Sequence, residues 1–350
     1  MDRNVLFAIS SAALFGASTP AAKQLVGDVP PILLAGLLYL GSGLGLLITR
    51  LLRDRNWQAS GLAPGEWRWL VGAIAVGGVA APVALMFGLA RTSAASASLL
   101  LNLEAVLTAL IAWTVFREHT SRRVAAGMLV IVAGGIVLAW PAQGVEAPDW
   151  LGPAAIALAC LLWALDNNLT RRVSASDVMF VAGSKGIVAG LINTTLGLWL
   201  GASLPATAVL LPTLLVGMAG YGVSLVLFVL ALRGLGTART GAYFSTAPFI
   251  GAAIALTLFG ETVTPAFWIA GALMAVGVWL HLTERHEHAH VHEPMRHTHP
   301  HKHDEHHQHE HDEDVEWACG KVHTHRHEHA MLVHRHPHFP DIHHRHSHDH

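Results

Sequence analysis

Apolar segments long enough to cross a lipid bilayer dominate this sequence. Roughly 20 residues at 1.5 Å each span the hydrocarbon core, and ten such segments lie in the first 283 residues. The predicted spans cover residues 4–26, 31–52, 67–90, 94–116, 122–140, 150–172, 178–201, 208–232, 238–260 and 265–283. A large soluble protein with fully buried helices is the competing interpretation, and ten segments in so short a chain argue against it. We therefore predict an all-α membrane protein.

The residues beyond 283 have a different composition. Of the 26 histidines, 25 lie between His281 and His350, and the remaining one is His119. The first 280 residues hold 15 Lys and Arg against 11 Asp and Glu, whereas the rest of the chain holds 7 against 13. Because histidine has a pKa of about 6.5, roughly a quarter of these rings are protonated at pH 7. We therefore separate a tail, residues 284–350, whose charge changes steeply near neutral pH.

Several classes of function are not supported by the sequence. Cys160 lies in an apolar run and Cys319 in the tail, so a disulfide framework is not expected. No strongly basic patch with interleaved aromatic residues occurs, so nucleic acid is not an expected partner. No Ser or Cys nucleophile lies in an elbow motif, so an enzyme is not predicted. The first apolar run is too long for a signal-peptide core and is followed by another span, which predicts that it is retained.

The distribution of Lys and Arg predicts the orientation, because cytoplasmic loops carry an excess of these residues. If the N-terminus is cytoplasmic, the outer side keeps only Lys23 and Arg91. The cytoplasmic side then collects Arg3, Arg50, Arg53, Arg55, Arg68, Arg117, Arg122, Arg123, Arg171, Arg172, Arg233, Arg239 and Arg285. We therefore expect a multi-pass protein of the cell membrane, with both termini in the cytoplasm.

The two halves of the membrane part resemble each other. RTSAASASLLLNLEAVLTALIAWTVFREHTS (91–121) aligns with GLGTARTGAYFSTAPFIGAAIALTLFGETVT (234–264) at a constant offset of 143, which places Glu118 on Glu261. Five spans per half is an odd number, so the second copy must enter the membrane in the opposite sense. Inverted repeats of this kind are typical of secondary transporters, which bind substrate near the bilayer midplane. We predict two five-helix repeats, residues 1–141 and 149–283.

These features, with the motifs NLEAVLTALIAWTVFREH, STAPFIGAAIALTLFGE and WALDNNLTRR, resemble the EamA-type branch of the drug/metabolite transporter superfamily. The resemblance covers residues 4–283, and the paired F-x-E endings are specific for the family but not for a substrate. It implies an all-helical carrier that works by alternating access, with spans 5 and 10 at the periphery. The family's proline is Pro248 in the second half, whereas Ala105 takes the matching place in the first, where a helix break is therefore less expected.

Charged residues within the spans are the first candidates for a site. A charge at the bilayer centre costs about 2.5–3.5 kcal/mol on insertion scales, so it needs a partner or a water-filled cavity. Glu104 lies near the middle of the fourth span, with Thr108 one turn away and Asn102 on a neighbouring face. Glu104 is either a coupling group of a proton-driven carrier or a structural partner of Lys185 or Lys23.

Two further groups complete the candidate set. Asp166 and Asn167 begin a polar turn in the sixth span, which either binds substrate or a coupling cation or forms an interfacial helix end. Lys185 lies among glycines in the seventh span, where it would meet an anionic substrate or Glu104, or extend to the membrane surface. Lys23 is expected to extend to the surface, and Glu118 and Glu261 to cap helix ends or pair with loop arginines. The predicted substrate and coupling residues are Asn102, Glu104, Thr108, Asp166, Asn167 and Lys185.

The tail has the composition of a metal-binding segment. Histidines recur at every second position in runs such as HEHAHVH (286–292), and imidazoles spaced closely can bind one Zn, Ni, Co or Cu ion together. Few large apolar residues are present, so we expect a disordered tail. A pH-sensitive solvated tail without a metal is the alternative. The predicted ligands are His286, His288, His290, His292, His297, His299, His301, His303, His306, His307, His309, His311, His323, His325, His327, His329, His343, His344, His346 and His348.

Two main functions remain open at this point. The first is a secondary transporter that exports or imports a small polar metabolite or drug, with a tail that senses or buffers transition metals. The second is a divalent-metal transporter whose tail collects the cargo, and a membrane-anchored metal store is a third. The spans offer Glu104, Asp166 and Cys160 but no histidine before His281, which favours the first. The expected partners are a small-molecule substrate, the lipid bilayer and metal ions; transport needs no cofactor, and a homodimer is left open.

Overall fold

The computed structural model describes residues 3–54, 60, 62, 65–115, 121–140, 149–170, 173, 177–283, 287–292, 295–301, 323–329 and 332–337. The chain divides into two compact units, Met1–Glu284 and Arg285–His350. Each unit is described by itself below.

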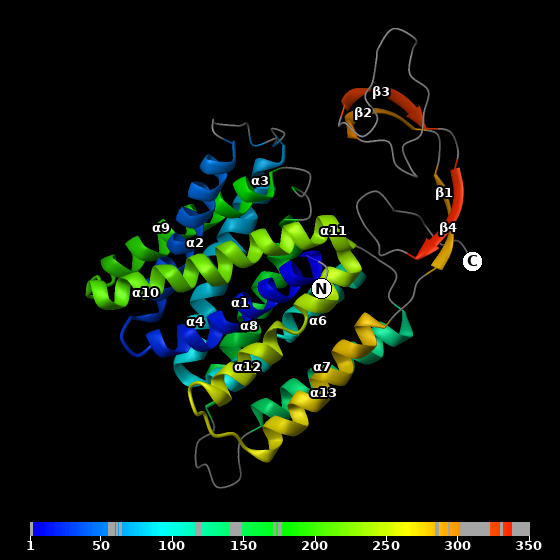
Figure 1. The fold of residues 1–350 in the computed structure, drawn as a ribbon. Helices are drawn as coiled ribbons and strands as arrows, with labels where there is room; N and C mark the ends of the chain where they lie inside the picture. Colours follow the sequence, from blue (N-terminus) through cyan, green and yellow to red (C-terminus); the bar gives the residue numbers. More distant parts are fainter. Residues whose placement is uncertain are drawn as a thin grey trace. The chain divides into compact units, whose positions relative to one another are not determined.

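The first unit is a bundle of helices (Figure 1). In its first half, the helices are α1 (Arg3–Leu25), α2 (Pro31–Asp54), α3 (Trp67–Ala73), η1 (Ile74–Ala80), α4 (Ala81–Arg91), α5 (Ala94–Leu100), α6 (Leu103–Thr114) and α7 (Arg122–Ala139). In its second half, they are α8 (Leu151–Thr170), α9 (Val178–Trp199), α10 (Thr207–Gly217), η3 (Met218–Val223), α11 (Ser224–Phe244), α12 (Ala247–Thr257) and α13 (Pro265–Leu282). The segments η1 and η3 are π-helical.

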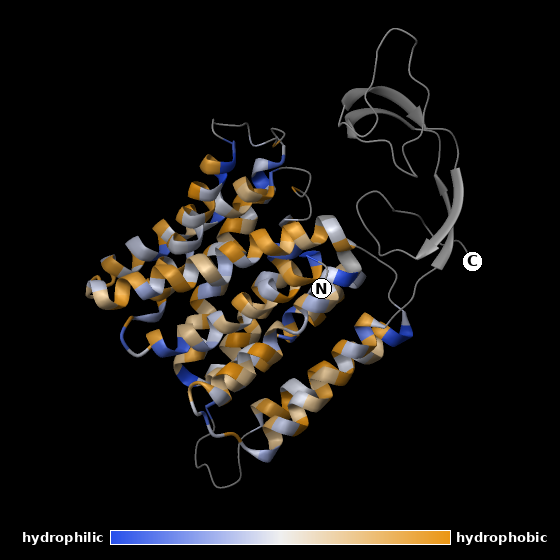
Figure 2. Cartoon of the chain, in the orientation of Figure 1, coloured by the Kyte–Doolittle hydropathy of each residue, from blue (hydrophilic) through white to orange (hydrophobic). Residues whose placement is uncertain are grey.

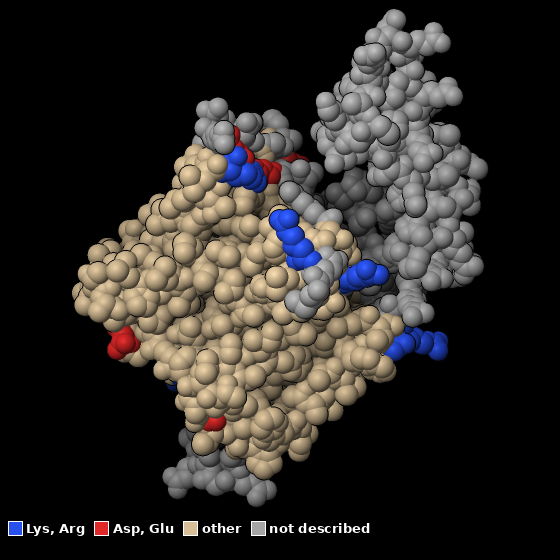
Figure 3. All heavy atoms as spheres, in the orientation of Figure 1, with Lys and Arg blue, Asp and Glu red and all other residues tan. Residues whose placement is uncertain are grey.

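The surface of this unit is that of a membrane protein. Apolar residues surround most of the helices (Figure 2), and charged side chains form only isolated spots on the face shown in Figure 3. Over the described residues, nine helical stretches are long and apolar enough to cross a bilayer. The ninth predicted span, 238–260, is instead built from the end of α11 and from α12. The prediction of an apolar helical bundle is confirmed, with the ninth of its predicted spans divided into two pieces.

Both halves contain an interrupted span. In the second half, Gly236 has a φ of 78° within α11, and a turn at Ser245 and Thr246 precedes α12. In the first half, a turn at Leu101 and Asn102 separates α5 from α6, although no proline lies there. The expectation that Ala105 makes a break less probable was therefore wrong. The buried Asn102 side chain stabilises this turn, because its Nδ2 donates a hydrogen bond to the Leu99 carbonyl at 2.8 Å.

The helices of the two halves pack in matching combinations. Helix α1 packs on α11 and α12, just as α8 packs on α4 and α6. Helix α2 packs on α9, and α7 packs on α13. The α7–α13 pair contacts the other helices mainly through α5 and α6. The remaining helices therefore form the body in which the candidate residues lie.

The α2–α9 contact brings two backbones together. A Cβ atom added at Gly43 would collide with the backbone of Ile187, and one added at Gly186 would lie 2.7 Å from Gly43 Cα. Small residues at such positions allow close helix packing in a membrane, where no hydrophobic effect drives helices together. This close pair holds Tyr39 on α2 and Lys185 on α9, both of which contribute to the site described below.

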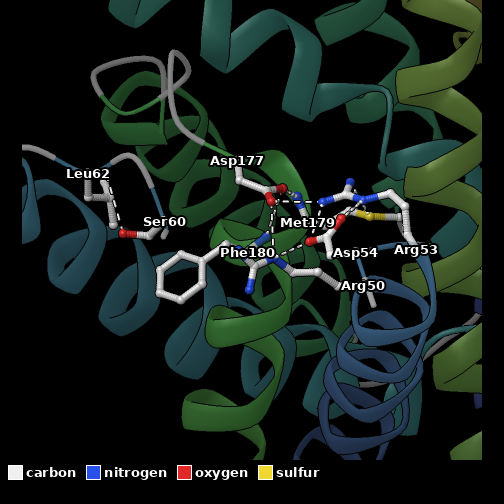
Figure 4. A network of polar contacts seen from close by, with 8 residues as sticks. All are labelled: Arg50, Arg53, Asp54, Ser60, Leu62, Asp177, Met179 and Phe180. Carbon is white, nitrogen blue, oxygen red and sulfur yellow. Dashed lines mark hydrogen bonds and ion pairs between the residues drawn. The ribbon is translucent and has the colours of Figure 1, made fainter. Parts of the chain in front are cut away.

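An ion-pair cluster fixes one end of this helix pair (Figure 4). Asp177 caps α9 by accepting hydrogen bonds from the backbone N–H groups of Met179 (2.9 Å) and Phe180 (3.4 Å). The same carboxylate accepts from Arg50 Nε and Arg53 Nη2, each at 3.0 Å, on α2. Burial would raise the pKa of Asp177, but these hydrogen bonds outweigh it and hold the pKa below the usual value. Arg50 is only 3% exposed, so it depends on this charged partner.

We predict that Asp177→Asn lowers the free energy of unfolding at pH 7 by about 1–3 kcal/mol, because hydrogen bonds to charged groups are lost. A carboxylate with a lowered folded-state pKa stabilises the protein above its unfolded pKa of about 3.9 and loses this effect as the pH falls through the folded value. The difference between wild type and variant should therefore shrink below about pH 4. Thermal unfolding in detergent measures both effects.

Asp149→Asn is the matched control for this substitution. Asp149 pairs with Arg91 at 3.1 Å, but the two side chains are 44% and 50% exposed. An exposed ion pair contributes less than about 1 kcal/mol. An equal loss of unfolding free energy in Asp177→Asn and Asp149→Asn would contradict a special role for the Asp177 cluster.

The described residues of the second unit form four strands in two antiparallel pairs. Strand β1 (Glu287–His292) pairs with β4 (Leu332–Pro337), and β2 (Met295–His301) pairs with β3 (His323–His329). The expectation of a tail without regular structure is therefore not confirmed. An alternation of period two is itself a strand pattern, and the runs of alternating histidine in HEHAHVH and HTHRHEH contain this signal.

Candidate functional site

The π-helical segment η1 organises the polar interior of the helical unit. A π-helical turn displaces main-chain carbonyls from the regular pattern and often marks a functional site. The carbonyl of Gly77 accepts hydrogen bonds from Tyr39 Oη at 3.0 Å and from Trp163 Nε1 at 3.1 Å. The carbonyl of Val79 accepts from Asn193 Nδ2 at 3.1 Å. Helices α2, α8 and α9 are thus all attached to the same interrupted segment.

Asp166 and Lys185 form an ion pair beside this segment. Lys185 Nζ donates to Asp166 Oδ2, and Thr170 donates to Asp166 Oδ1 at 3.1 Å. The two charged side chains are only 6% and 17% exposed. Gly77 has room for no side chain, because a Cβ there would collide with the Asp166 carboxylate. The structure therefore pairs Lys185 with Asp166 and not with Glu104, which was one of the partners that the sequence left open.

Glu104 belongs to a second polar group. Asn167 Nδ2 donates to Glu104 Oε1 at 2.9 Å and approaches Thr108 Oγ1 at 3.4 Å. Glu104 and Thr108 come from α6, one turn apart, and Asn167 comes from α8. Asp166 and Asn167 are neighbours in the chain, so the two polar groups lie side by side. Five of the six predicted substrate residues are thereby brought together.

Asn102 is the exception. It is 5% exposed at the turn between α5 and α6, and its amide bonds to the Leu99 carbonyl and approaches Met274 Sδ at 3.9 Å. Its position supports a structural role at the helix break rather than direct contact with a substrate.

The exposed side of Asn167 is directed away from the apolar face of α8. Leu158, Leu161 and Leu165 are 49%, 38% and 38% exposed and form a stripe at helical spacing. Each residue turns an α-helix by about 100°, so Asn167, two residues after Leu165, lies roughly 200° away from that stripe. Asn167 is nevertheless an exposed residue. Glu104 and Thr108 are half-buried beside it, so the Glu104 group is partly open on the side of α8 that lies opposite the apolar stripe.

The outermost predicted residues have structural partners. Lys23 Nζ donates to the Leu89 carbonyl at 2.5 Å. Glu261 accepts hydrogen bonds from the backbone N–H groups of Ala94 and Ala95, each at 2.8 Å, at the first turn of α5. The capping role expected of Glu261 is confirmed. Glu118 lies outside the described residues, as do the tail histidines His286, His303, His306, His307, His309, His311, His343, His344, His346 and His348.

Sequence reasoning missed three residues of the site. Tyr39, Trp163 and Gly77 carry no charge, so a search for charged groups inside spans does not find them. Gly77 and Gly78 lie in η1, and Gly220 and Gly222 lie at matching places in η3. This repetition of glycines is the signal by which the sequence could have pointed to the two π-helical segments. Among the side chains that the structure describes, no three His, Cys, Asp or Glu residues gather in a way that could hold a metal ion.

The arrangement suits recognition of a small molecule better than chemistry on one. The Asp166–Lys185 pair is neutral as a whole, whereas Glu104 is held by an amide and lies near a hydroxyl.

The model of the EamA-like transporter family matches this chain twice, over residues 3–140 and 150–283. The chain belongs to the EamA-like transporter family.

Two individual comparisons agree with this family. A protein of Methanothermobacter thermautotrophicus described as an uncharacterized transporter is 24% identical over 287 residues, which cover 78% of this chain and 84% of the relative. A crystal structure, whose title names no function, matches with a TM-score of 0.61 at 21% identity. The match covers 80% of this chain and 96% of the other, and it supports the fold alone.

We predict that Lys185→Met destabilises the protein by about 3–5 kcal/mol, because it leaves a buried carboxylate without its partner. The double variant Lys185→Met/Asp166→Asn should recover most of this loss, since it removes both charges. Thermal unfolding in detergent gives both values. Lys23→Met is the control, as Lys23 bonds to a carbonyl rather than to a charge. A double variant no more stable than Lys185→Met would contradict the pairing.

Proposed function

We propose that this protein is a secondary transporter that moves a small polar metabolite or drug across the membrane by alternating access. The observation that carries the proposal is the accessible polar group of Glu104, Asn167 and Thr108 beside a π-helical interruption inside an apolar bundle. Polar side chains at membrane depth are costly and usually belong to a transport pathway. Family membership supports transport, and the site supports the polar character of the substrate.

An inverted duplication supports alternating access. Segment η3 begins at Met218 and η1 at Ile74, so they lie 218 − 74 = 144 residues apart, close to the offset of 143 between the aligned segments. The helix packing has the same correspondence, because α1 packs on α11 and α12, and α8 packs on α4 and α6. Five spans per repeat give the two copies opposite orientations, and transporters of this architecture switch by moving one repeat against the other around a fixed site.

The proposed orientation has both termini in the cytoplasm of a cell-membrane protein. The support is the placement of Lys and Arg in the sequence, because cytoplasmic loops retain positive charge. In this orientation, the Asp177 cluster lies at the cytoplasmic end of α2 and α9. The histidine-rich tail then shares the compartment from which an exporter takes its substrate or to which an importer delivers it.

Metal as cargo is the weaker candidate, and the composition of the tail is the observation that favours it. A metal pathway needs several ligands along the spans. In the described spans, Asp166 is already paired with Lys185, which leaves Glu104 as the acidic residue with an accessible carboxylate. The tail is therefore proposed as a sensor or buffer of transition metals.

We predict that the full-length protein in proteoliposomes transports a member of a metabolite and drug panel, and that Glu104→Gln lowers this rate at least about tenfold, since it removes a charge at the site. The chain truncated after residue 284 should keep the rate. Asp149→Asn serves as the control for a carboxylate replaced outside the site. Uptake of a divalent metal that survives Glu104→Gln but is lost on truncation would favour the metal transporter instead.

We predict that the full-length protein binds Zn²⁺ or Ni²⁺ and that truncation after residue 284 removes this binding. Imidazole must be deprotonated to bind a metal, so affinity should fall steeply between about pH 7 and pH 5.5. Isothermal titration calorimetry at both pH values measures this. Equal binding by full-length and truncated protein would place the metal outside the tail.

A further inference from the structure

The substrate class can be narrowed from the atoms of the Glu104 group that lack partners. Glu104 Oε1 is bonded by Asn167 Nδ2, but no hydrogen bond within the described residues reaches Glu104 Oε2 or Asn167 Oδ1. Thr108 Oγ1 receives only the 3.4 Å contact from Asn167. Three oxygen atoms from α6 and α8 therefore remain able to accept a hydrogen bond on the accessible side.

The two carboxylates of this region, Asp166 and Glu104, have different partners. Lys185 neutralises Asp166, whereas Glu104 has an amide and a hydroxyl around it. A carboxylate at membrane depth needs a cationic partner or a proton. An anionic group arriving at these oxygens would meet the like charge of Glu104, and of the three oxygens only the Thr108 hydroxyl could donate a hydrogen bond to it. The site therefore favours a cation that donates hydrogen bonds.

An aromatic cluster is joined to the polar group through Tyr39. The Tyr39 hydroxyl bonds to Gly77, and its ring centre lies 5.8 Å from that of Tyr221 on η3. Tyr221 meets Phe15 edge-on at 6.0 Å, and Phe15 lies 5.2 Å from Phe244. Gly77, which accepts this hydrogen bond, lies against the Asp166 carboxylate, so polar and aromatic groups are neighbours.

The aromatic cluster is not part of the fully buried core. Phe15, Tyr221 and Phe244 are each partly exposed. Phe15 follows the exposed Leu6 by nine residues, which places it about 180° around α1 from that outward position. Helix α1 is also packed between helices of both halves, including α4, α11 and α12. Phe15 is therefore directed to the interior of the bundle, where it contacts Tyr221 and Phe244.

We propose, on the basis of the transport function proposed above, that the substrate is a protonated primary amine with an apolar, ring-bearing body. A primary ammonium has three N–H donors, which match the free acceptors of Glu104, Asn167 and Thr108. Its ring packs on the aromatic cluster, where offset or edge-on contacts and the negative ring faces favour a cationic arylalkylamine.

The test compares three probes with one ring and different charges: 2-phenylethylamine, phenylalanine and 3-phenylpropionate. Binding to the full-length protein in detergent is measured at pH 7 by isothermal titration calorimetry, which avoids leakage of a neutral amine across a membrane. The amine should bind at least about tenfold more tightly than phenylalanine, whose carboxylate meets Glu104. 3-Phenylpropionate should not bind. Equal binding of all three, or a preference for either carboxylate, would overturn the proposal.

Variants separate the polar and aromatic contributions. Glu104→Gln should weaken binding of 2-phenylethylamine about 10- to 100-fold, since it removes a charge-assisted hydrogen bond. Thr108→Val has the same shape and should weaken it a few-fold, which keeps the test decisive if Glu104→Gln folds poorly. Phe244→Leu should weaken 2-phenylethylamine several-fold more than propylamine, which lacks a ring. Asp149→Asn should change none of these values, and unchanged binding in both Glu104→Gln and Thr108→Val would contradict the assignment.

Failure of the substrate class can be told apart from failure of the transport function. If amines do not bind but another solute of the panel is carried in a Glu104-dependent manner, the substrate class is wrong and the transporter stands. If no solute of the panel moves through the wild-type protein, the proposed function itself falls, and the amine proposal falls with it.

Discussion

The site depends on the hydrogen bonds that satisfy the displaced carbonyls of η1. A bilayer core contains no water to solvate free main-chain groups, so a helix interruption there requires side chains as partners. Tyr39, Trp163 and Asn193 supply these partners from three different helices. An interrupted helix and its polar neighbours stabilise each other.

The fold could be predicted from the sequence to a considerable extent because hydrophobic length is a direct signal of membrane helices. What the pattern did not give is the interruption in the first half. The turn at Leu101 and Asn102 depends on an asparagine that bonds to its own backbone, not on a proline. The division of the ninth predicted span lies at the turn of Ser245 and Thr246, just before Pro248 of α12, where the sequence did indicate a break.

The candidate site was predictable in its members but not in its pairings. Charges inside a span are rare enough to identify Glu104, Asp166 and Lys185 individually. Their partners depend on which faces of α6, α8 and α9 meet, and this depends on close packing at glycines such as Gly43, Gly77 and Gly186. The sequence left Glu104 open as a partner of Lys185, whereas Lys185 pairs with Asp166. The aromatic half of the site was missed because aromatic residues are ordinary members of apolar spans.

The duplicated scaffold explains how one molecule can have a polar wall and an aromatic wall. Gly77 on η1 lies against Asp166 of α8, and Gly220 on η3 lies against Ser18 of α1 in the same way. Equivalent backbone positions thus carry a charged residue in one half and a small hydroxyl in the other. Phe15 and Tyr221 occupy the space beside Ser18, where no ion pair has to be accommodated. Each of the two groups takes side chains from both halves of the chain: the polar group joins α6 to α8, and the aromatic group joins α1 and α2 to η3 and α11.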